Sequence, residues 1–174
     1  MNLYSFHTNP EQLLHADTAH DQVPHLIWDL YKYNPAELKK RESLLAVDPE
    51  YAYKYAKNIV KGPSPVGEAA IAKNARYAYQ YAAEVLKGPF PAGEATIAKD
   101  VRYACWYARE VLKGPFPAGE AAIAKDPKYA YWYAAEVLKG PFPAGEATIG
   151  KVPVFARLYA ENVLKGPFPA GNIR

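Results

Sequence analysis

Hydrophobic and polar positions along this chain follow a pattern that repeats every 26 residues. The phrase KGPFPAG, or its variant KGPSPVG, recurs from Asp48 onward, and its first glycine marks the interval. Gly88 and Gly114, for example, are 26 residues apart, and the full series is Gly62, Gly88, Gly114, Gly140 and Gly166. A fixed period of this size indicates stacked units, because one such unit cannot bury its hydrophobic face alone.

Each unit carries the start and stop signals of one long and one short helix. In the third unit, Asp100 is a favourable N-cap, since its carboxylate can accept hydrogen bonds from the free amides of the first turn. We expect the long helix to end near Lys113, because Gly114 can adopt the left-handed conformation and Pro115 cannot continue a helix. A short helix is expected from about residue 117 to residue 125, with proline in its first turn and an alanine-rich body.

The long helix is amphipathic at α-helical spacing. Placing successive residues about 100° apart gathers large tyrosines and small alanines on one half of the helix surface. Rings of one unit are expected to lie over alanine methyl groups of the next, with the phenol hydroxyls reaching the rim. In the third unit this inward half consists of Tyr103, Ala104, Tyr107, Ala108, Val111 and Leu112.

These patterns predict an all-α fold, specifically an α-solenoid of two-helix, 26-residue repeats with one long and one short helix each. Residues 1–47 are expected to form a divergent helical N-terminal cap, because NPEQLLHAD resembles the short-helix phrase and HLIWDLYKYNPAE resembles the end of a long helix. The repeats form one continuous predicted domain, with boundaries at 48–73, 74–99, 100–125, 126–151 and a truncated 152–174.

Composition and charge narrow the class of protein. Half of the 174 residues are hydrophobic, and 21 basic against 18 acidic residues leave a net charge of only +3, which is weak evidence about partners. The single cysteine, Cys105, excludes an intramolecular disulfide. Neither a signal-peptide pattern nor about 18 consecutive apolar residues occurs in the sequence. We therefore expect a cytoplasmic protein that has no membrane partner.

A candidate partner-binding stripe runs across the solvent side of the predicted long helices. Its centre is the pair Trp106 and Trp132, which occupy equivalent places in neighbouring units and are bordered by arginines and lysines. Exposed tryptophans beside cations are typical of binding surfaces, although the same residues could simply pack if the helical phase is off by one position. The stripe comprises Gln80, Arg102, Trp106, Arg109, Lys113, Lys128, Trp132, Lys139 and Leu158.

Acidic residues on the same helices bear on the type of partner. Glu84, Glu110 and Glu136 each precede a lysine by three residues, so each is expected to pair with that lysine on the helix surface. Such pairing would lower the free positive potential of the stripe. The sequence therefore argues against a surface dedicated to phosphates.

A second variable row lies at the edge of the inward face, where it could line a groove between units or merely complete the packing. Cys105 belongs to this row and is a poor candidate nucleophile, because no histidine is near it in sequence. At the last long helix, Val152 and Val154 replace polar residues, which suggests self-association and a possible homodimer. The row consists of Tyr53, Tyr79, Cys105, Tyr131 and Arg157.

Catalytic and metal-binding patterns are weak in this sequence. His15, Asp17, His20 and Asp21 could together hold a divalent cation, but their spacing matches no strong zinc pattern, and the aspartates equally suit turns and helix caps. Paired carboxylates, a phosphate-binding glycine loop and a Ser/His/Asp arrangement are not recognisable. We therefore expect a protein that is not an enzyme and uses no metal and no cofactor.

The repeated unit, DPxYAYxYAxxVLKGPFPAGEAAIAKD in outline, resembles short tandem helical repeats in uncharacterised proteins of tailed bacteriophages and large DNA viruses. The likeness covers residues 48–171 and is carried by the phrases YAYWYA, VLKG and GEAAIAKD. It implies an α-helical repeat protein of viral or prophage origin that acts in the host cytoplasm, and it transfers no catalytic residue.

Three functional hypotheses follow from these sequence features. The first is a protein-binding module, such as a phage product that inhibits or modulates a host defence factor. The second is nucleic-acid or nucleotide binding, in which Trp106 and Trp132 stack on bases and nearby cations meet phosphate. The third is a synthetic consensus scaffold, against which the irregular residues 1–47 argue.

Overall fold

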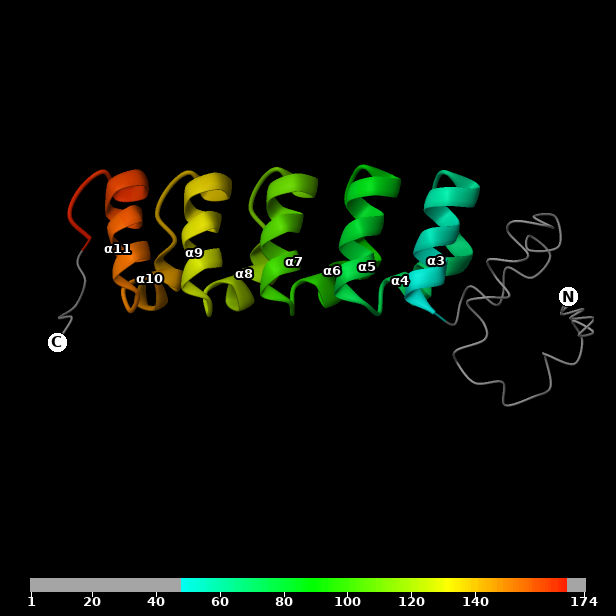
Figure 1. Ribbon diagram of the computed structural model, residues 1–174, viewed down its shortest axis with the longest axis horizontal. Coiled ribbons are helices and arrows are strands. Elements are labelled where there is room, and N and C mark those ends of the chain that lie inside the picture. The colour runs from blue at the N-terminus through cyan, green and yellow to red at the C-terminus, as the bar shows by residue number, and fades with distance from the viewer. Residues whose placement is uncertain (1–47, 169–174) are drawn as a thin grey trace, which may run out of the picture. The chain divides into compact units, whose positions relative to one another are not determined.

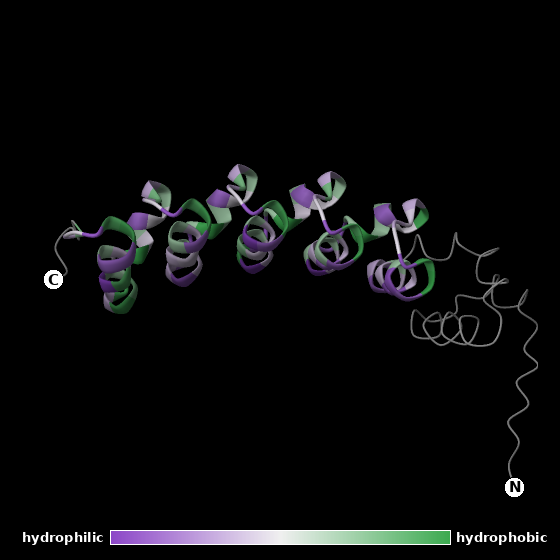
Figure 2. Ribbon diagram, turned by 90° about the horizontal axis from the view of Figure 1, so that it is seen from above, coloured by the Kyte–Doolittle hydropathy of each residue, from purple (hydrophilic) through white to green (hydrophobic). Residues whose placement is uncertain are grey.

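The computed structural model describes residues 48–168. This part of the chain is helical and contains no strand. The long helices lie side by side in one layer (Figure 1), and the short helices form a second layer along it, as Figure 2 shows from above. Each of the first four long helices contacts the next long helix and the short helix that follows it. The predicted cap, residues 1–47, lies outside the described residues, as do residues 169–174.

Equivalent helices recur along the chain in the order that the sequence predicts. The long helices begin with an α-helical part: α3 (Pro49–Tyr55), α5 (Ala75–Gln80), α7 (Val101–Trp106), α9 (Pro127–Trp132) and α11 (Pro153–Tyr159). Each continues into a π-helical part: η3 (Ala56–Val60), η4 (Tyr81–Leu86), η5 (Tyr107–Leu112), η6 (Tyr133–Leu138) and η7 (Ala160–Leu164). The short helices are α4 (Pro65–Ile71), α6 (Pro91–Ile97), α8 (Pro117–Ile123) and α10 (Pro143–Ile149).

Side-chain caps start the first four long helices, as predicted. The Asp100 carboxylate oxygen Oδ1 accepts hydrogen bonds from the amides of Arg102, at 3.0 Å, and Tyr103, at 3.2 Å. Val152 has no side-chain acceptor, so α11 begins without such a cap. In the other three helices the same role belongs to Asp48, Asn74 and Asp126.

The long helices end in a way that the sequence analysis did not predict. Lys113 adopts the left-handed conformation with φ 53°, and no glycine within residues 48–168 has a positive φ. The prediction for Gly114 is therefore wrong by one residue. The cause is the π-helical turn, in which the Lys113 amide donates to the carbonyl of Ala108, five residues back, so the reversal is reached before the glycine. The Gly114 amide donates to the same carbonyl at 3.1 Å.

Replacing Lys113 by glycine is expected to give a protein more stable by about 1 kcal/mol than replacing it by alanine. Both variants lose the same charge, but only glycine adopts a φ of 53° without a steric cost. Urea unfolding of the two variants measures the difference. An alanine variant as stable as the glycine variant would contradict the strain that we assign to this position.

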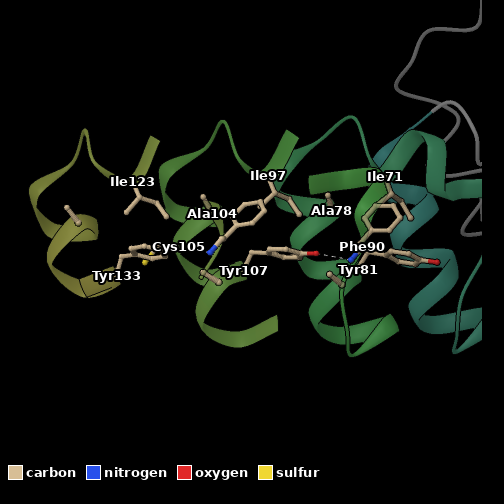
Figure 3. Close-up of a cluster of buried hydrophobic side chains, with 14 of the residues drawn as sticks. Ile71, Ala78, Tyr81, Phe90, Ile97, Ala104, Cys105, Tyr107, Ile123 and Tyr133 are labelled. Atoms are coloured by element: carbon tan, nitrogen blue, oxygen red, sulfur yellow. Dashed lines mark hydrogen bonds between the residues drawn. The ribbon is translucent and has the colours of Figure 1, made fainter. Parts of the chain in front are cut away.

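Small and aromatic side chains at equivalent places build the interior. Of the predicted inward half of the third unit, Ala104, Tyr107 and Ala108 are buried and the other three residues are partly buried. The ring of Tyr107 packs against that of Phe116, with 5.2 Å between the centroids. Figure 3 shows this arrangement repeated in neighbouring units, together with the fully buried isoleucines Ile71, Ile97 and Ile123.

A glycine in each short helix lets that helix lie directly on the long helix. A Cβ atom on Gly119 would be 2.6 Å from Cδ1 of Phe116 and 2.9 Å from Cβ of Ala104, both closer than van der Waals contact allows. This close approach between the two helices is not evident from the sequence. The equivalent positions, with the same close approach to an alanine, are Gly67, Gly93 and Gly145.

Buried tyrosine hydroxyls join each unit to the preceding one. The Tyr107 hydroxyl accepts a hydrogen bond from the amide of Phe90, at 2.9 Å (Figure 3), and it donates to Oε1 of Glu94, at 2.8 Å. This hydroxyl therefore lies inside the stack, and the expectation that it reaches the rim is wrong. Burial and the neighbouring carboxylate raise the pKa of Tyr107 above its usual value, so the hydroxyl remains a donor at neutral pH. The equivalent tyrosines are Tyr81, Tyr133 and Tyr159.

No helix within the described part of the chain is both long enough and apolar enough to cross a membrane. Charged side chains interrupt the stretches of apolar residues in every unit, among them Glu110 and Lys113. The helices gain their stability from contacts between units instead, because single helices of this length are marginal in water.

Candidate binding surface

Aromatic rings from neighbouring units form a cluster on the long helices. The ring centroid of Trp106 lies 5.7 Å from that of Tyr103 and 5.9 Å from that of Tyr79. Tyr79 and Tyr103 are also neighbours, at 5.8 Å. The next unit repeats the pair, with Trp132 5.6 Å from its own helix neighbour, Tyr129. We call these five residues, Tyr79, Tyr103, Trp106, Tyr129 and Trp132, the aromatic strip.

Cations lie over the rings of the aromatic strip. The guanidinium of Arg102 is 5.3 Å from the Tyr103 centroid. The ammonium of Lys128 is 4.5 Å from the Trp132 centroid and 5.4 Å from that of Tyr129. A cation over a ring face is held by the ring quadrupole. The strip therefore offers flat apolar surface and positive charge at the same place.

The two tryptophans are neither fully exposed nor sealed inside the protein. Trp106 and Trp132 are both partly buried, and Trp132 packs against the hydrophobic core with part of its surface. Gln80 and Leu158 hold the equivalent places in the flanking units and are also partly buried. The carbonyl oxygen Oε1 of Gln80 is buried without a hydrogen-bond partner in the described chain. The side chains at these four equivalent positions therefore pack against their neighbours and also expose part of their surface.

Arg109 is tied to neighbouring carboxylates. Its guanidinium contacts Glu110, at 2.7 Å, and Glu136 of the next unit, at 3.1 Å. The hydrogen bond to Glu110, with support from Glu136, raises the pKa of Arg109. Lys113 and Lys139 are the residues at which η5 and η6 end, and both adopt the left-handed conformation. Among the cations of the predicted stripe, Arg102 and Lys128 therefore contact the rings of the aromatic strip, whereas Arg109 is paired with carboxylates.

The glutamates of the long helices bridge neighbouring units. Glu84 accepts hydrogen bonds from Lys57 and from the Tyr53 hydroxyl, the latter at 2.7 Å. These contacts outweigh the effect of partial burial, so the pKa of Glu84 is lowered. Glu110 likewise accepts from Tyr79. The expected pairing of these glutamates with lysines three residues later is wrong, since the carboxylates reach across to the adjacent helix.

The second variable row takes part in packing for much of its length. Tyr53 and Cys105 are buried, and Tyr131 is partly buried with its hydroxyl accepting from the side chain of Asn162 at 3.0 Å. Burial raises the pKa of Cys105 to about 11, so its thiol stays protonated at neutral pH and is a poor nucleophile. Arg157 is exposed. A groove along this row remains a prediction.

Two other sequence predictions concern the ends of the chain. Val154 exposes 57 % of its surface and Val152 is partly buried, so self-association through this unit remains a prediction. His15, Asp17, His20 and Asp21 lie outside the described residues. From residue 48 to residue 168, no group of three or more histidine, cysteine, aspartate or glutamate side chains is placed to hold a metal ion.

Sequence reasoning missed one recurrent feature of the surface, a lysine in the left-handed conformation at the end of every long helix. The signal was present, because the phrase KGP has the same lysine in all five units. A lysine at the end of a helix also interacts favourably with the negative end of the helix dipole, so the residue type alone does not reveal an unusual backbone conformation. Only the backbone conformation shows that this residue type is costly there.

Comparison with protein-family models, with curated proteins and with solved structures finds no match. The function therefore has to be argued from the surfaces of the chain itself. Two surfaces stand out, the aromatic strip with Arg102 and Lys128, and the row of lysines at the helix ends.

Proposed function

We propose that this chain is a non-catalytic α-solenoid of two-helix, 26-residue repeats that binds a protein along the aromatic strip. The observation that supports this most is the strip itself, in which partly exposed tryptophan and tyrosine rings lie beneath Arg102 and Lys128. Tryptophan, tyrosine and arginine are enriched among the few residues that carry most of the binding energy in protein interfaces. Stacked repeats are well suited to this role, because they present equivalent side chains along one extended surface.

The resemblance to phage repeats supports a more specific proposal about the partner. We propose that it is a host protein, such as a component of a defence system, which the chain inhibits or modulates in the host cytoplasm. Nucleic acid is the second candidate, because the same rings could stack on bases. The pairing of Arg109 with Glu110 and Glu136 lowers the free positive charge beside the strip and favours the protein partner.

A pull-down from bacterial lysate with matched surface variants tests the proposal. We expect a captured protein to be lost with Trp106→Ala/Trp132→Ala and with Arg102→Ala/Lys128→Ala, whether or not nuclease is added. The control carries Ala118→Glu and Ala144→Glu on the exposed side of the short helices, which changes the net charge by the same amount as the cation variant. We expect this control to retain the protein, with all variants first checked for unchanged thermal unfolding.

Two outcomes of the pull-down would count against the proposal. Capture that disappears after nuclease treatment would indicate nucleic-acid binding. Equal capture by the wild type and by both strip variants would show that the strip is not the interface.

A further inference from the structure

The turns that end the long helices place five lysines in equivalent positions. Each adopts the left-handed conformation with φ between 52° and 54°, and each is exposed. In Figure 1 these turns form a row along the upper edge of the helices. We call this set the lysine edge: Lys61, Lys87, Lys113, Lys139 and Lys165.

Packing does not explain why the lysine edge recurs. Within residues 48–168 none of its members takes part in an ion pair. The glutamates that precede them on the helix, such as Glu84 and Glu110, bind side chains of neighbouring units instead. The helix dipole places only about half a negative charge at each helix end, so each ammonium group leaves a net positive charge for a ligand.

The backbone conformation makes lysine a costly choice at these positions. A left-handed φ is unfavourable for any residue with a Cβ atom, and glycine would avoid the cost. The chain does place a glycine beside each lysine, as in Lys113 and Gly114, yet the lysine takes the left-handed conformation. Strain that is kept at equivalent positions is a reason to look for a function.

The spacing of the lysine edge suggests the shape of a ligand. Neighbouring long helices are in contact, and packed helices lie about 8–10 Å apart. Because the five turns have the same conformation, their lysines follow the same spacing. A polyproline II segment advances about 9 Å per turn of three residues, so every third side chain points the same way at a matching interval. Same-face residues of a β-strand are only about 7 Å apart and do not match.

We infer that the lysine edge binds an acidic segment of a partner protein in the polyproline II conformation, with Asp or Glu at every third position. The inference rests on the proposed function as a protein-binding module, and it names the chemistry of one part of the partner. An exposed proline follows each lysine by two residues, as Pro89 and Pro115 do, so the intervening ligand residues are expected to be apolar.

The charge density of the lysine edge favours a peptide over nucleic acid. Double-stranded DNA carries about one negative charge per 1.7 Å of its axis. The lysine edge provides one positive charge about every 8–10 Å, so most phosphates would have no counterpart. An acidic residue at every third position of a peptide gives one charge for each lysine.

Binding of a labelled synthetic peptide to the purified full-length protein tests the inference. The probe is fluorescein-labelled (Glu-Pro-Pro)5, compared with a peptide of the same composition whose five glutamates are consecutive. Fluorescence anisotropy at low ionic strength measures both affinities. The test variant is Lys87→Asn/Lys113→Asn/Lys139→Asn, since asparagine tolerates the left-handed conformation. The control variant, Lys73→Gln/Lys99→Gln/Lys125→Gln, removes the same charge from exposed lysines that follow the short helices.

We expect the regularly spaced peptide to bind more tightly than the clustered one, and the test variant to lose about tenfold in affinity while the control variant loses much less. Equal losses in the two variants, or equal affinity for the two peptides, would overturn the inference. So would single-stranded DNA of the same charge that displaces the peptide, or a wild-type protein that binds neither peptide. Loss of peptide binding in Trp106→Ala/Trp132→Ala would place the peptide on the aromatic strip instead. Unchanged binding there would support the lysine edge even if the aromatic strip fails its own test.

Discussion

The substitution Gly119→Ala is expected to lower the free energy of unfolding by about 2 kcal/mol. The new methyl group would lie 2.6 Å from the Phe116 ring and 2.9 Å from the Ala104 methyl. Neither neighbour can move easily, because Phe116 is 97 % buried against Tyr107 and Ala104 is fully buried on the long helix. The short helix α8 would have to shift away from α7, which would loosen the core of that unit. Urea unfolding of the full chain measures the change.

Gly114→Ala is the matched control for this substitution. Its nearest neighbour would be the carbonyl oxygen of Leu112 at 3.9 Å, and its φ is not positive, so alanine fits without strain. We expect a change within about 0.5 kcal/mol. A larger loss of unfolding free energy for Gly114→Ala than for Gly119→Ala would indicate that Gly114 ends the long helix, as the sequence predicted.

Comparison of Gly114 and Gly119 shows which helix boundaries can be predicted from local sequence and which cannot. The start of the long helix follows from Asp100 and its two hydrogen bonds, and the start of the short helix follows from Pro117, so both were predictable. The end of the long helix depends on a π-helical turn, which shifts the left-handed residue to Lys113. No local propensity rule distinguishes an α-helical from a π-helical last turn in this sequence, and the error of one residue follows from that.

Contacts between units were the other part that the sequence did not reveal. Glu94 and Tyr107 are 13 residues apart and bind each other across units, and the same pair recurs in every neighbouring unit. Because the same glutamate and tyrosine occur in every unit, comparing the units gives no sign that the two residues contact each other.

The candidate surface was predicted only in part, because comparing the units reveals residues that differ between units and not residues that are the same in all of them. The residues Trp106 and Trp132 vary between units and were predicted, whereas the left-handed conformation of the invariant lysines was not.

Tyr133→Phe is expected to lower the free energy of unfolding by about 3 kcal/mol, although it removes a single oxygen atom. The hydroxyl donates to Oε1 of Glu120 at 2.8 Å and accepts from the amide of Phe116 at 2.8 Å. Phenylalanine would leave that buried amide without a partner and would remove a hydrogen bond to a carboxylate. Since Tyr133 is fully buried, water cannot replace the hydroxyl without a change in packing. Urea unfolding followed by circular dichroism measures the loss.

Tyr131→Phe, two residues earlier on the same helix, is the matched control. Its hydroxyl meets Asn162 at the surface, so we expect a change within about 0.5 kcal/mol. Neighbouring units stabilise each other only through their shared interface. The loss at Tyr133 falls on the interface between the third and fourth units, so we also expect the urea transition to broaden as the two sides unfold separately. Equal urea midpoints for Tyr133→Phe and Tyr131→Phe would show that loss of the buried hydroxyl has no energetic cost. Apolar contacts alone would then account for the stability of the interface between these units.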